Sequence, residues 1–431
     1  MQKKRGGKGN WWLALGLSFI GAVLVIWFEA PMRLFLKGKS RIAPYPYSLS
    51  GGEDVSRTIT SLEERIQKLP GEALDRAALS AAYLARARSS GANEDYEKAE
   101  RLAKESLRSL PISNLGAKMT LARVAEARHE FKKAIGIARE VLSESRKSDA
   151  LALLATSNLA LGELNEASRA ADTLVNDRPS LGNHSLRALV LTAQGRDAEA
   201  EYEFKRGIAA EDAGELAEST RTRCLLARFY LKRGRISEAE DLIHEALRIS
   251  PGNHLALNLR GELELARGQF SSAEKYFFEA FSSSRQMIYF RNYGNAKKLK
   301  GNIAGAEQTW QEAEKILRKE IGSGGYGHRL ELVQLLLDRG KQSDLVEALK
   351  LAVEESRNRQ SADSLRVLAR AEARAEKWKE AREHLLQIAR TGIKDADSYA
   401  LAAQVESALG NQGLAKFYSD YAKTINPHPI P

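Results

Sequence analysis

A small residue recurs along most of this chain at a nearly constant spacing. From residue 99 onward, the steps between successive small residues, here called markers, lie between 33 and 39 residues. A period of this length is typical of repeat architectures in which each repeat is one supersecondary unit. Two helices fit in such a unit, and neither can bury its apolar stripe without a neighbouring unit. The markers are Ala99, Ala134, Ala167, Ala200, Ala239, Ala273, Ala306, Leu345, Ala381 and Ala415, and Leu345 departs from the pattern because it stands where Ala is usual.

Two further residue types keep a fixed distance from the markers. Glycine readily adopts the left-handed backbone that ends a helix, whereas proline cannot continue one. We therefore expect the marker where the second helix crosses closely over the first, glycine at the end of the first helix and proline at the end of the unit. Glycine lies five residues before a marker at 162, 195, 234, 268, 301, 340 and 410, and proline lies twelve after one at 111, 179, 251 and 427.

This pattern resembles the tetratricopeptide repeat (TPR), a helix–turn–helix unit of about 34 residues. The best-matching stretches are LLATSNLALGELNEASRAADTLVNDRP at 153–179 and LLARFYLKRGRISEAEDLIHEALRISP at 225–251. The resemblance implies an all-α TPR solenoid, wound as a right-handed superhelix of about ten repeats over residues 71–427. An entry helix at 54–70 precedes it and a tail at 428–431 follows. The two 39-residue steps depart from the pattern, with extra residues near 211–219 and 322–327.

An uncharged apolar run occupies residues 11–28, after a basic tail at 1–10. In a helix this run spans roughly 27 Å, about the hydrocarbon thickness of a bilayer, and tryptophans at both ends fit the membrane interface. A cleaved signal peptide is the alternative, but a bulky residue and a proline surround Ala30, which makes a poor cleavage site. We therefore expect one transmembrane helix that precedes the solenoid, then a Pro/Gly/Ser spacer at 29–53. Its small residues Ala14, Ser18 and Ala22 could form a homodimer contact.

The distribution of charge bears on partners and on orientation. The chain carries a net charge of +10, of which +7 lies in residues 1–41. The rest is nearly balanced, so we expect no nucleic-acid partner. Because a short tail with four cations crosses a membrane with difficulty, we expect the N-terminus in the cytoplasm and the repeats outside it, as in a bacterial inner-membrane protein. The alternative orientation leaves the TPR domain cytoplasmic.

Catalytic and cofactor-binding signatures are weak. Cys224 is the single cysteine, and the seven histidines have no metal-ligand spacing. The glycines at 322–327 formally match a dinucleotide-binding motif, but the pattern around them predicts helices on both sides and not the strand that such a site requires. We find no nucleophile–base constellation. We therefore expect no enzyme activity, no cofactor and no metal site.

The TPR resemblance implies protein partners held in a concave groove. It places the groove-facing residues 15, 11 and 8 positions before each marker. Arg291 and Asn295, one helical turn apart, resemble the cation–amide pair of carboxylate-clamp TPRs, so we expect an acidic peptide segment centred on 288–298. Glu331 and Asp363 depart from that clamp, and a merely solvated concave face is the alternative. The predicted groove residues are Arg228, Asn258, Glu262, Arg291, Asn295, Lys298, Gln334, Arg366 and Arg370, with Arg123, Glu126 and Gln404 at equivalent places.

A second interpretation is a regulatory or assembly subunit of a membrane enzyme complex in envelope, polysaccharide or lipid biogenesis. It arises because the chain is similar to anchored TPR proteins of bacterial envelope-lipid regulation. Those proteins end in a zinc knuckle, whereas this chain ends in Asn426-Pro-His-Pro-Ile-Pro431 without a cysteine pair. A membrane-anchored scaffold therefore remains the favoured prediction.

Overall fold

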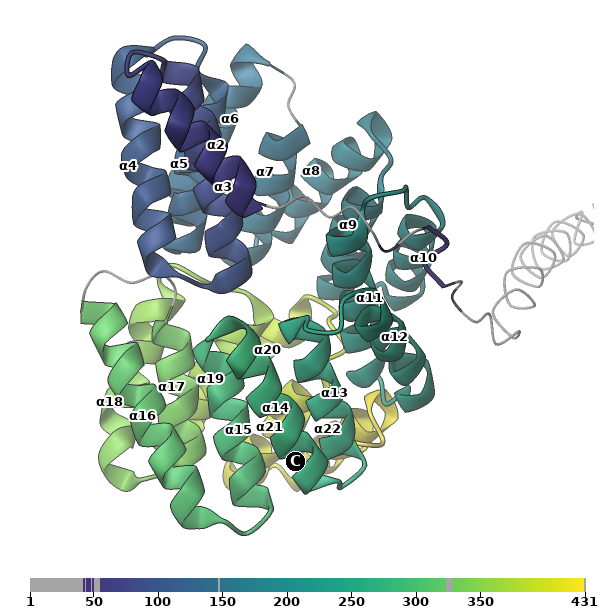
Figure 1. Cartoon of the computed structure of the whole chain (residues 1–431). Helices are drawn as coiled ribbons and strands as arrows, with labels where there is room; N and C mark the ends of the chain where they lie inside the picture. The colour runs from purple at the N-terminus through teal and green to yellow at the C-terminus, as the bar shows by residue number, and fades with distance from the viewer. Residues whose placement is uncertain are drawn as a thin grey trace, which may run out of the picture. The chain divides into compact units, whose positions relative to one another are not determined.

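A computed structural model describes residues 42, 44–47 and 49 and the ranges 55–145, 148–322 and 328–429. These residues form twenty-one α-helices and no strand (Figure 1), which confirms the all-α prediction for this part of the chain. Across the same ranges, no helix combines the length and the apolar character needed to cross a membrane. The predicted transmembrane helix at 11–28 lies outside the described residues.

After the single helix α2 (Val55–Lys68), the described helices follow one another as ten helix–turn–helix pairs. Within each pair the two helices pack together, and each pair packs on the next. The pairs are α3 (Ala73–Ser90) with α4 (Asn93–Ser109), α5 (Leu115–Ala127) with α6 (Phe131–Glu144), α7 (Ser148–Leu161) with α8 (Leu164–Asp177), α9 (Leu181–Ala193) with α10 (Asp197–Ala209), α11 (Leu216–Leu231) with α12 (Ile236–Ile249), α13 (His254–Ala266) with α14 (Phe270–Ser284), α15 (Met287–Leu299) with α16 (Ile303–Gly322), α17 (Arg329–Arg339) with α18 (Gln342–Ser356), α19 (Ala362–Arg374) with α20 (Trp378–Arg390), and α21 (Ala396–Ala408) with α22 (Gln412–Ile425).

Each marker residue lies in the second helix of its pair and is buried. Close packing also occurs four residues further along the second helix. There the ring of Phe277 lies against Gly261, and the ring of Trp310 lies against Gly294. A Cβ on either glycine would come within 2.6 Å of a ring atom. Small residues therefore let the two helices of a pair approach closely.

The turn inside most pairs has the left-handed backbone that the sequence predicts. The seven glycines that lie five residues before a marker all have φ between 66° and 90°. His129 and Glu376 occupy the same place in two other pairs, with φ of 61° and 57°. A non-glycine residue adopts this conformation at a cost, so these two turns are strained.

Three of these turn glycines, at 162, 195 and 234, also contact loops far away in the sequence. A Cβ on Gly195 would lie 1.9 Å from the carbonyl oxygen of Gly392, and one on Gly162 would lie 2.8 Å from that of Gln360. The Gln360 N–H donates to the Ala160 carbonyl at 2.9 Å. We call this line of contacts the seam.

The seam has a regular register. The turns inside the third, fourth and fifth pairs contact the loops that follow the eighth, ninth and tenth pairs. Gly91, in the first pair, lies against Gln286 after the sixth. At the far end, the Asn426 side-chain amide donates to the Leu231 carbonyl at 3.3 Å. The turns of the first, third, fourth and fifth pairs therefore each contact the loop that follows the fifth pair beyond them.

We predict that Ala239→Leu destabilises the array. Ala239 is fully buried where α12 crosses α11, and extra methylenes in a packed crossing cost ~1–3 kcal/mol. Denaturant unfolding followed by circular dichroism measures the change. Ala198→Leu, an exposed position on α10, is the matched control and should change stability by less than about 0.5 kcal/mol. Equal stability of Ala239→Leu and the parent would contradict the helix crossing described here.

Candidate functional site

Side chains from most first helices line a partly open cavity with a volume of about 820 Å³. Its lining runs from Ala87 on α3 to Asn426 after α22, so the seam brings distant pairs around one space. Eight arginine or lysine side chains, six carboxylates and two histidines line it. Eight of the nine predicted groove residues are among them, namely Arg228, Asn258, Glu262, Arg291, Asn295, Gln334, Arg366 and Arg370.

Asp338 on α17 gathers several of these predicted residues. The Arg370 guanidinium lies 2.9 Å from Asp338 Oδ1, and the Asn295 amide donates to Oδ2 at 2.7 Å. Arg291 Nε lies 3.5 Å from the same carboxylate. Lys298 does not line the cavity, but its ammonium donates to the Asp338 backbone carbonyl at 3.0 Å. A carboxylate of the chain itself therefore occupies the place that we expected for an acidic partner.

A second charged cluster surrounds Arg366 on α19. Its guanidinium lies 3.1 Å from Asp363, 3.2 Å from Asp395 and 3.7 Å from Asp397. Lys232 reaches Asp397 across the seam at 2.6 Å. Burial alone would raise the Asp363 pKa, but Arg366 and Lys232 outweigh burial and lower it to about 2. The Asp363 side chain nevertheless keeps 71% of its surface accessible, so it projects into the cavity.

A row of polar side chains connects α13, α15 and α17. Asn258 donates to Glu262 at 2.7 Å and accepts from the Asn292 amide at 2.9 Å. Arg291 donates to Asn292 at 3.3 Å and also to Gln334. The predicted residues of the middle pairs thus form one hydrogen-bonded network that fixes their orientation.

Four arginines in the cavity have no such partner among the described residues, namely Arg88, Arg228, Arg285 and Arg359. The guanidiniums of Arg88 on α3 and Arg228 on α11 form no hydrogen bond or ion pair with any described residue, although both line the cavity. Burial and the nearby Arg123 and Arg221 lower the Arg88 pKa. The cavity therefore contains several guanidiniums without a direct carboxylate partner in the described part of the chain, which favour a negatively charged ligand.

The other predicted groove residues lie elsewhere. Arg123 and Glu126 form an ion pair at 2.9 Å on α5 and do not line the cavity. Gln404 lines a separate hollow between α21 and α22. Arg123, Glu126 and Gln404 are thus separate from the cavity network.

Neither an ionised thiol nor a cluster of metal ligands is found among the described residues. Cys224 is fully buried, and burial raises the pKa of its thiol to about 12, which removes the thiolate. Among the described residues, no three His, Cys, Asp or Glu side chains are arranged to hold a metal ion. What this arrangement can do is bind charged groups through ion pairs and hydrogen bonds.

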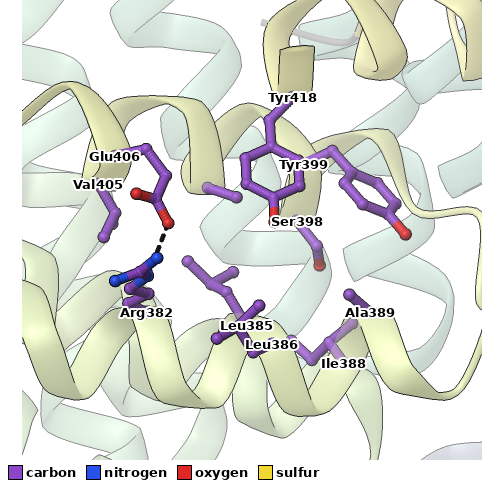
Figure 2. A pocket seen from close by; sticks show the side chains of 11 residues that line it. Arg382, Leu385, Leu386, Ile388, Ala389, Ser398, Tyr399, Val405, Glu406 and Tyr418 are labelled. Atoms are coloured by element: carbon purple, nitrogen blue, oxygen red, sulfur yellow. Dashed lines mark ion pairs between the residues drawn. The ribbon is translucent and has the colours of Figure 1, made fainter. Parts of the chain in front are cut away.

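A smaller hollow between α20, α21 and α22 is apolar (Figure 2). Leu385, Val405 and Tyr418 line it, and an ion pair between Arg382 and Glu406 at 2.8 Å closes one side. Its free space is about 10 Å³, roughly what one water molecule requires. This hollow is a gap in helix packing and not a ligand site.

The predicted groove set left out several charged residues that line the cavity, among them Arg88, Asp338 and Asp397, and Asp363 was named only as a departure from the clamp. Arg88 lies eleven residues before Ala99, so the spacing that selects Arg228 also selects Arg88. Asp338 lies seven residues before its marker, and Asp363 and Asp397 lie eighteen before theirs. None of these three positions belongs to the family spacing of 15, 11 and 8 residues, so that spacing did not select the internal carboxylates.

We predict that Asp338→Asn lowers stability by about 1–3 kcal/mol, because it leaves charged donors without their acceptor. Denaturant unfolding of purified protein measures this change as a shift in midpoint. Asp241→Asn on α12 is the control, since Asp241 is exposed and has no ion pair, and it should shift stability by less than about 0.5 kcal/mol. A midpoint for Asp338→Asn equal to that of the control would show that the carboxylate does not organise the cavity.

Comparison with known proteins gives similarity at two levels. Residues 224–285 match the tetratricopeptide repeat family. The DnaJ homolog subfamily C member 7 homolog of Schizosaccharomyces pombe is 29% identical over 177 residues, which are 36% of this chain and 35% of that protein. The match thus spans about a third of the relative's length.

Solved structures show a more distant likeness. A human IFIT1 dimer with PPP-AAAA is 15% identical with a TM-score of 0.45, over 86% of this chain and 95% of that one. A tetratricopeptide repeat protein from Parabacteroides merdae is 18% identical with a TM-score of 0.41, over 68% and 98%. PilW, a type IV pilus biogenesis factor, is 16% identical with a TM-score of 0.40, over 47% and 93%. The residues that match the tetratricopeptide repeat family, 224–285, run from the later part of α11 through α14.

Proposed function

We propose that this chain is a scaffold that binds protein partners in its concave cavity and thereby assembles or localises a complex. The observation that carries this proposal is the cavity itself, lined by charged side chains among which Arg88 and Arg228 form no ion pair with any described residue. Tetratricopeptide repeats commonly present such surfaces to extended segments of other proteins. No catalytic step is proposed.

The chemistry of the cavity favours an acidic peptide segment as the bound group. The arginine fork forms two parallel hydrogen bonds to a carboxylate, and Arg228 is free to do so. We therefore place the centre of binding closer to α11 than the predicted residues 288–298, because Arg291 already contacts Asp338. A partner with several carboxylates could also replace Asp338 at Arg291, Asn295 and Arg370.

Access to the cavity sets a condition on the partner. The seam closes one side, with His129 bonded to Glu355 at 2.6 Å and Lys232 to Asp397 at 2.6 Å. A folded domain does not fit a space of about 820 Å³, which is the size of an ordinary small-ligand pocket. The partner is therefore an extended segment that enters from the open side, or the seam opens to admit it.

The location of the scaffold is part of the proposal. Residues 11–28 anchor it in a bacterial inner membrane as a single-pass helix, with the repeats outside the cytoplasm. The uncharged run, the flanking tryptophans and the four cations before it support this arrangement. The stripe Ala14, Ser18 and Ala22 supports a homodimer through the same helix. A cytoplasmic TPR domain is the alternative orientation.

A second candidate function is a regulatory or assembly subunit of a membrane enzyme complex in envelope, polysaccharide or lipid biogenesis. The resemblance to anchored envelope TPR proteins favours it, and it depends on the same anchor. The two functions differ in outcome, since loss of a regulatory subunit changes the turnover of the associated enzyme. Loss of a scaffold changes where its partners are found.

We predict that Arg228→Glu combined with Arg88→Glu weakens binding of a labelled Glu-rich decapeptide by about tenfold or more, which corresponds to ~1.4 kcal/mol. The reversed charges repel the peptide, so its affinity should also depend less on salt. Fluorescence anisotropy at several ionic strengths measures both effects. Arg169→Glu on α8, outside the cavity and 72% exposed, is the matched control.

The pair Arg291→Glu with Lys298→Glu provides a second comparison. It should weaken binding as well, but it also removes contacts to Asp338, so unchanged helicity must be checked by circular dichroism. If the peptide binds equally to the parent and to both double variants, the polar side chains only solvate the concave face. The proposed acidic partner would then be wrong.

We predict that deleting residues 1–30 releases the protein from membranes as a soluble helical chain, because it removes the apolar run. Carbonate extraction and circular dichroism test this in the host cell. The full chain should stay in the membrane pellet. Intact-mass analysis that finds a mature chain starting near residue 31 would instead support the signal-peptide alternative.

A further inference from the structure

Residues 44–47 lie against helices that come far later in the sequence. This segment belongs to a stretch predicted to be an extended spacer, yet Tyr45 is only 3% exposed. Tyr45 contacts α12 and the loop between α10 and α11, residues about 167 to 203 positions away. A spacer with no function of its own would leave such a side chain in solvent.

The backbone of Tyr45 is held at both polar groups by one ion pair on α12. Its N–H donates to Glu245 Oε1 at 2.6 Å, and its carbonyl accepts from Arg248 Nη2 at 3.2 Å. Glu245 and Arg248 are themselves paired at 2.7 Å. Burial alone would raise the Glu245 pKa, but hydrogen bonds from Arg248 and from the Tyr45 N–H outweigh burial and lower it.

The tyrosine hydroxyls are bound by the loop that follows α10. The Tyr45 hydroxyl donates to the Asp212 carbonyl at 3.3 Å and accepts from the Gly214 N–H at 3.1 Å. The Tyr47 hydroxyl donates to the Glu211 carbonyl at 3.3 Å. The two rings pack edge to face with centroids 5.5 Å apart. The hydroxyl, the backbone N–H and the backbone carbonyl of Tyr45 thus all have hydrogen-bond partners.

This loop is the insertion that lengthens one marker step to 39 residues. A buried ion pair fixes its start, because Arg223 donates to Glu211 Oε2 at 2.7 Å and to Oε1 at 2.9 Å. Ser219 donates to the same carboxylate at 2.6 Å. The Glu211 side chain faces inward, so its backbone carbonyl is left to accept from Tyr47.

We propose that residues 211–215 together with Glu245 and Arg248 form a docking site for an extended, tyrosine-containing segment, and that residues 44–47 of the same chain are its occupant. Eight residue steps separate Tyr47 from Val55, and an extended chain covers at most about 29 Å over that length. This short connection favours docking within one chain over exchange between chains.

Docking determines where the preceding polypeptide leaves the array. Residue 44 leaves from the surface of α12 and not from α2, the first described helix. If the chain is anchored as proposed above, the array is attached to its anchor at the fifth pair. This consequence rests on the proposed function. The docking itself does not depend on the anchor.

Photo-crosslinking tests the occupant. In the full chain, in detergent micelles, Tyr47 is replaced by p-benzoylphenylalanine, and crosslinked peptides are identified by mass spectrometry. We expect an intramolecular crosslink to the peptide that contains residues 211–215. A crosslinked dimer would show that a second copy occupies the site, and crosslinks confined to other regions would show that residues 44–47 do not dock there. Either result overturns the proposal.

Hydrogen exchange tests the contacts. With Tyr45→Ala, the Gly214 amide should exchange at least about tenfold faster, because the tyrosine hydroxyl that accepts its hydrogen bond is absent. Tyr45→Phe should have the same effect at Gly214 and leave the contact with Glu245 intact. Tyr202→Ala on α10, an exposed tyrosine away from the site, is the control.

The exchange experiment also separates this proposal from the membrane anchor. Unchanged exchange at Gly214 in both Tyr45 variants would overturn the docking site, whatever the location of the protein. If docking is observed but the full chain is extracted from membranes by carbonate, only the anchor of the proposed function is wrong.

Discussion

The contact between turn glycines and distant loops is the constraint on which the cavity depends. At Gly195 a Cβ would lie 1.9 Å from the Gly392 carbonyl oxygen, so the backbones can meet there only if residue 195 carries no side chain. Glycine in these turns therefore serves two purposes, because it supplies the left-handed backbone and also the close approach. As a result Arg88 from the first pair and Arg366 from the ninth line the same space. A wider coil would leave an open groove in which these charges do not act on one ligand.

The electrostatics of the cavity follow from this enclosure. Charges taken out of water must be compensated, and the chain does this largely by itself, with Asp338 for Arg291 and Arg370, and Asp397 for Lys232. An incoming carboxylate therefore gains less binding free energy at these positions than at an unpaired guanidinium, because it must displace an internal carboxylate that is already bound. At Arg88 and Arg228, no internal carboxylate of the described residues competes with the ligand. The internal carboxylates thus favour a partner with several acidic groups over one with a single charge.

Local features of the fold could be predicted from the sequence, whereas contacts across the seam could not. The marker spacing and the glycine positions predict how adjacent helices pack and where the turn between them lies, because a few residues determine that local geometry. The pairing of Lys232 with Asp397 depends instead on a rotation between pairs that accumulates over five of them, and no local pattern encodes it. Among site residues, Arg88 was within reach of the spacing rule. Asp338 was not, because it lies outside the positions that the family places in the groove. The spacer composition likewise gave no sign that Tyr45 is buried.

The ion pair between Arg223 and Glu211 is difficult to explain by stability alone. At the position equivalent to Arg223, sixteen residues before the marker, other pairs have buried Leu257, Phe290 and Leu365. Replacing a buried ion pair by apolar residues of similar volume is often neutral or stabilising, so an apolar residue would suffice if the fifth pair only had to pack. What the ion pair adds is a defined course for the inserted loop, with Glu211 turned inward and the backbone groups of Asp212 and Gly214 directed at Tyr45. The loop that departs from the repeat period is thus also the proposed docking site. Because this site requires a fixed backbone, the free-energy cost of burying Arg223 has a structural reason.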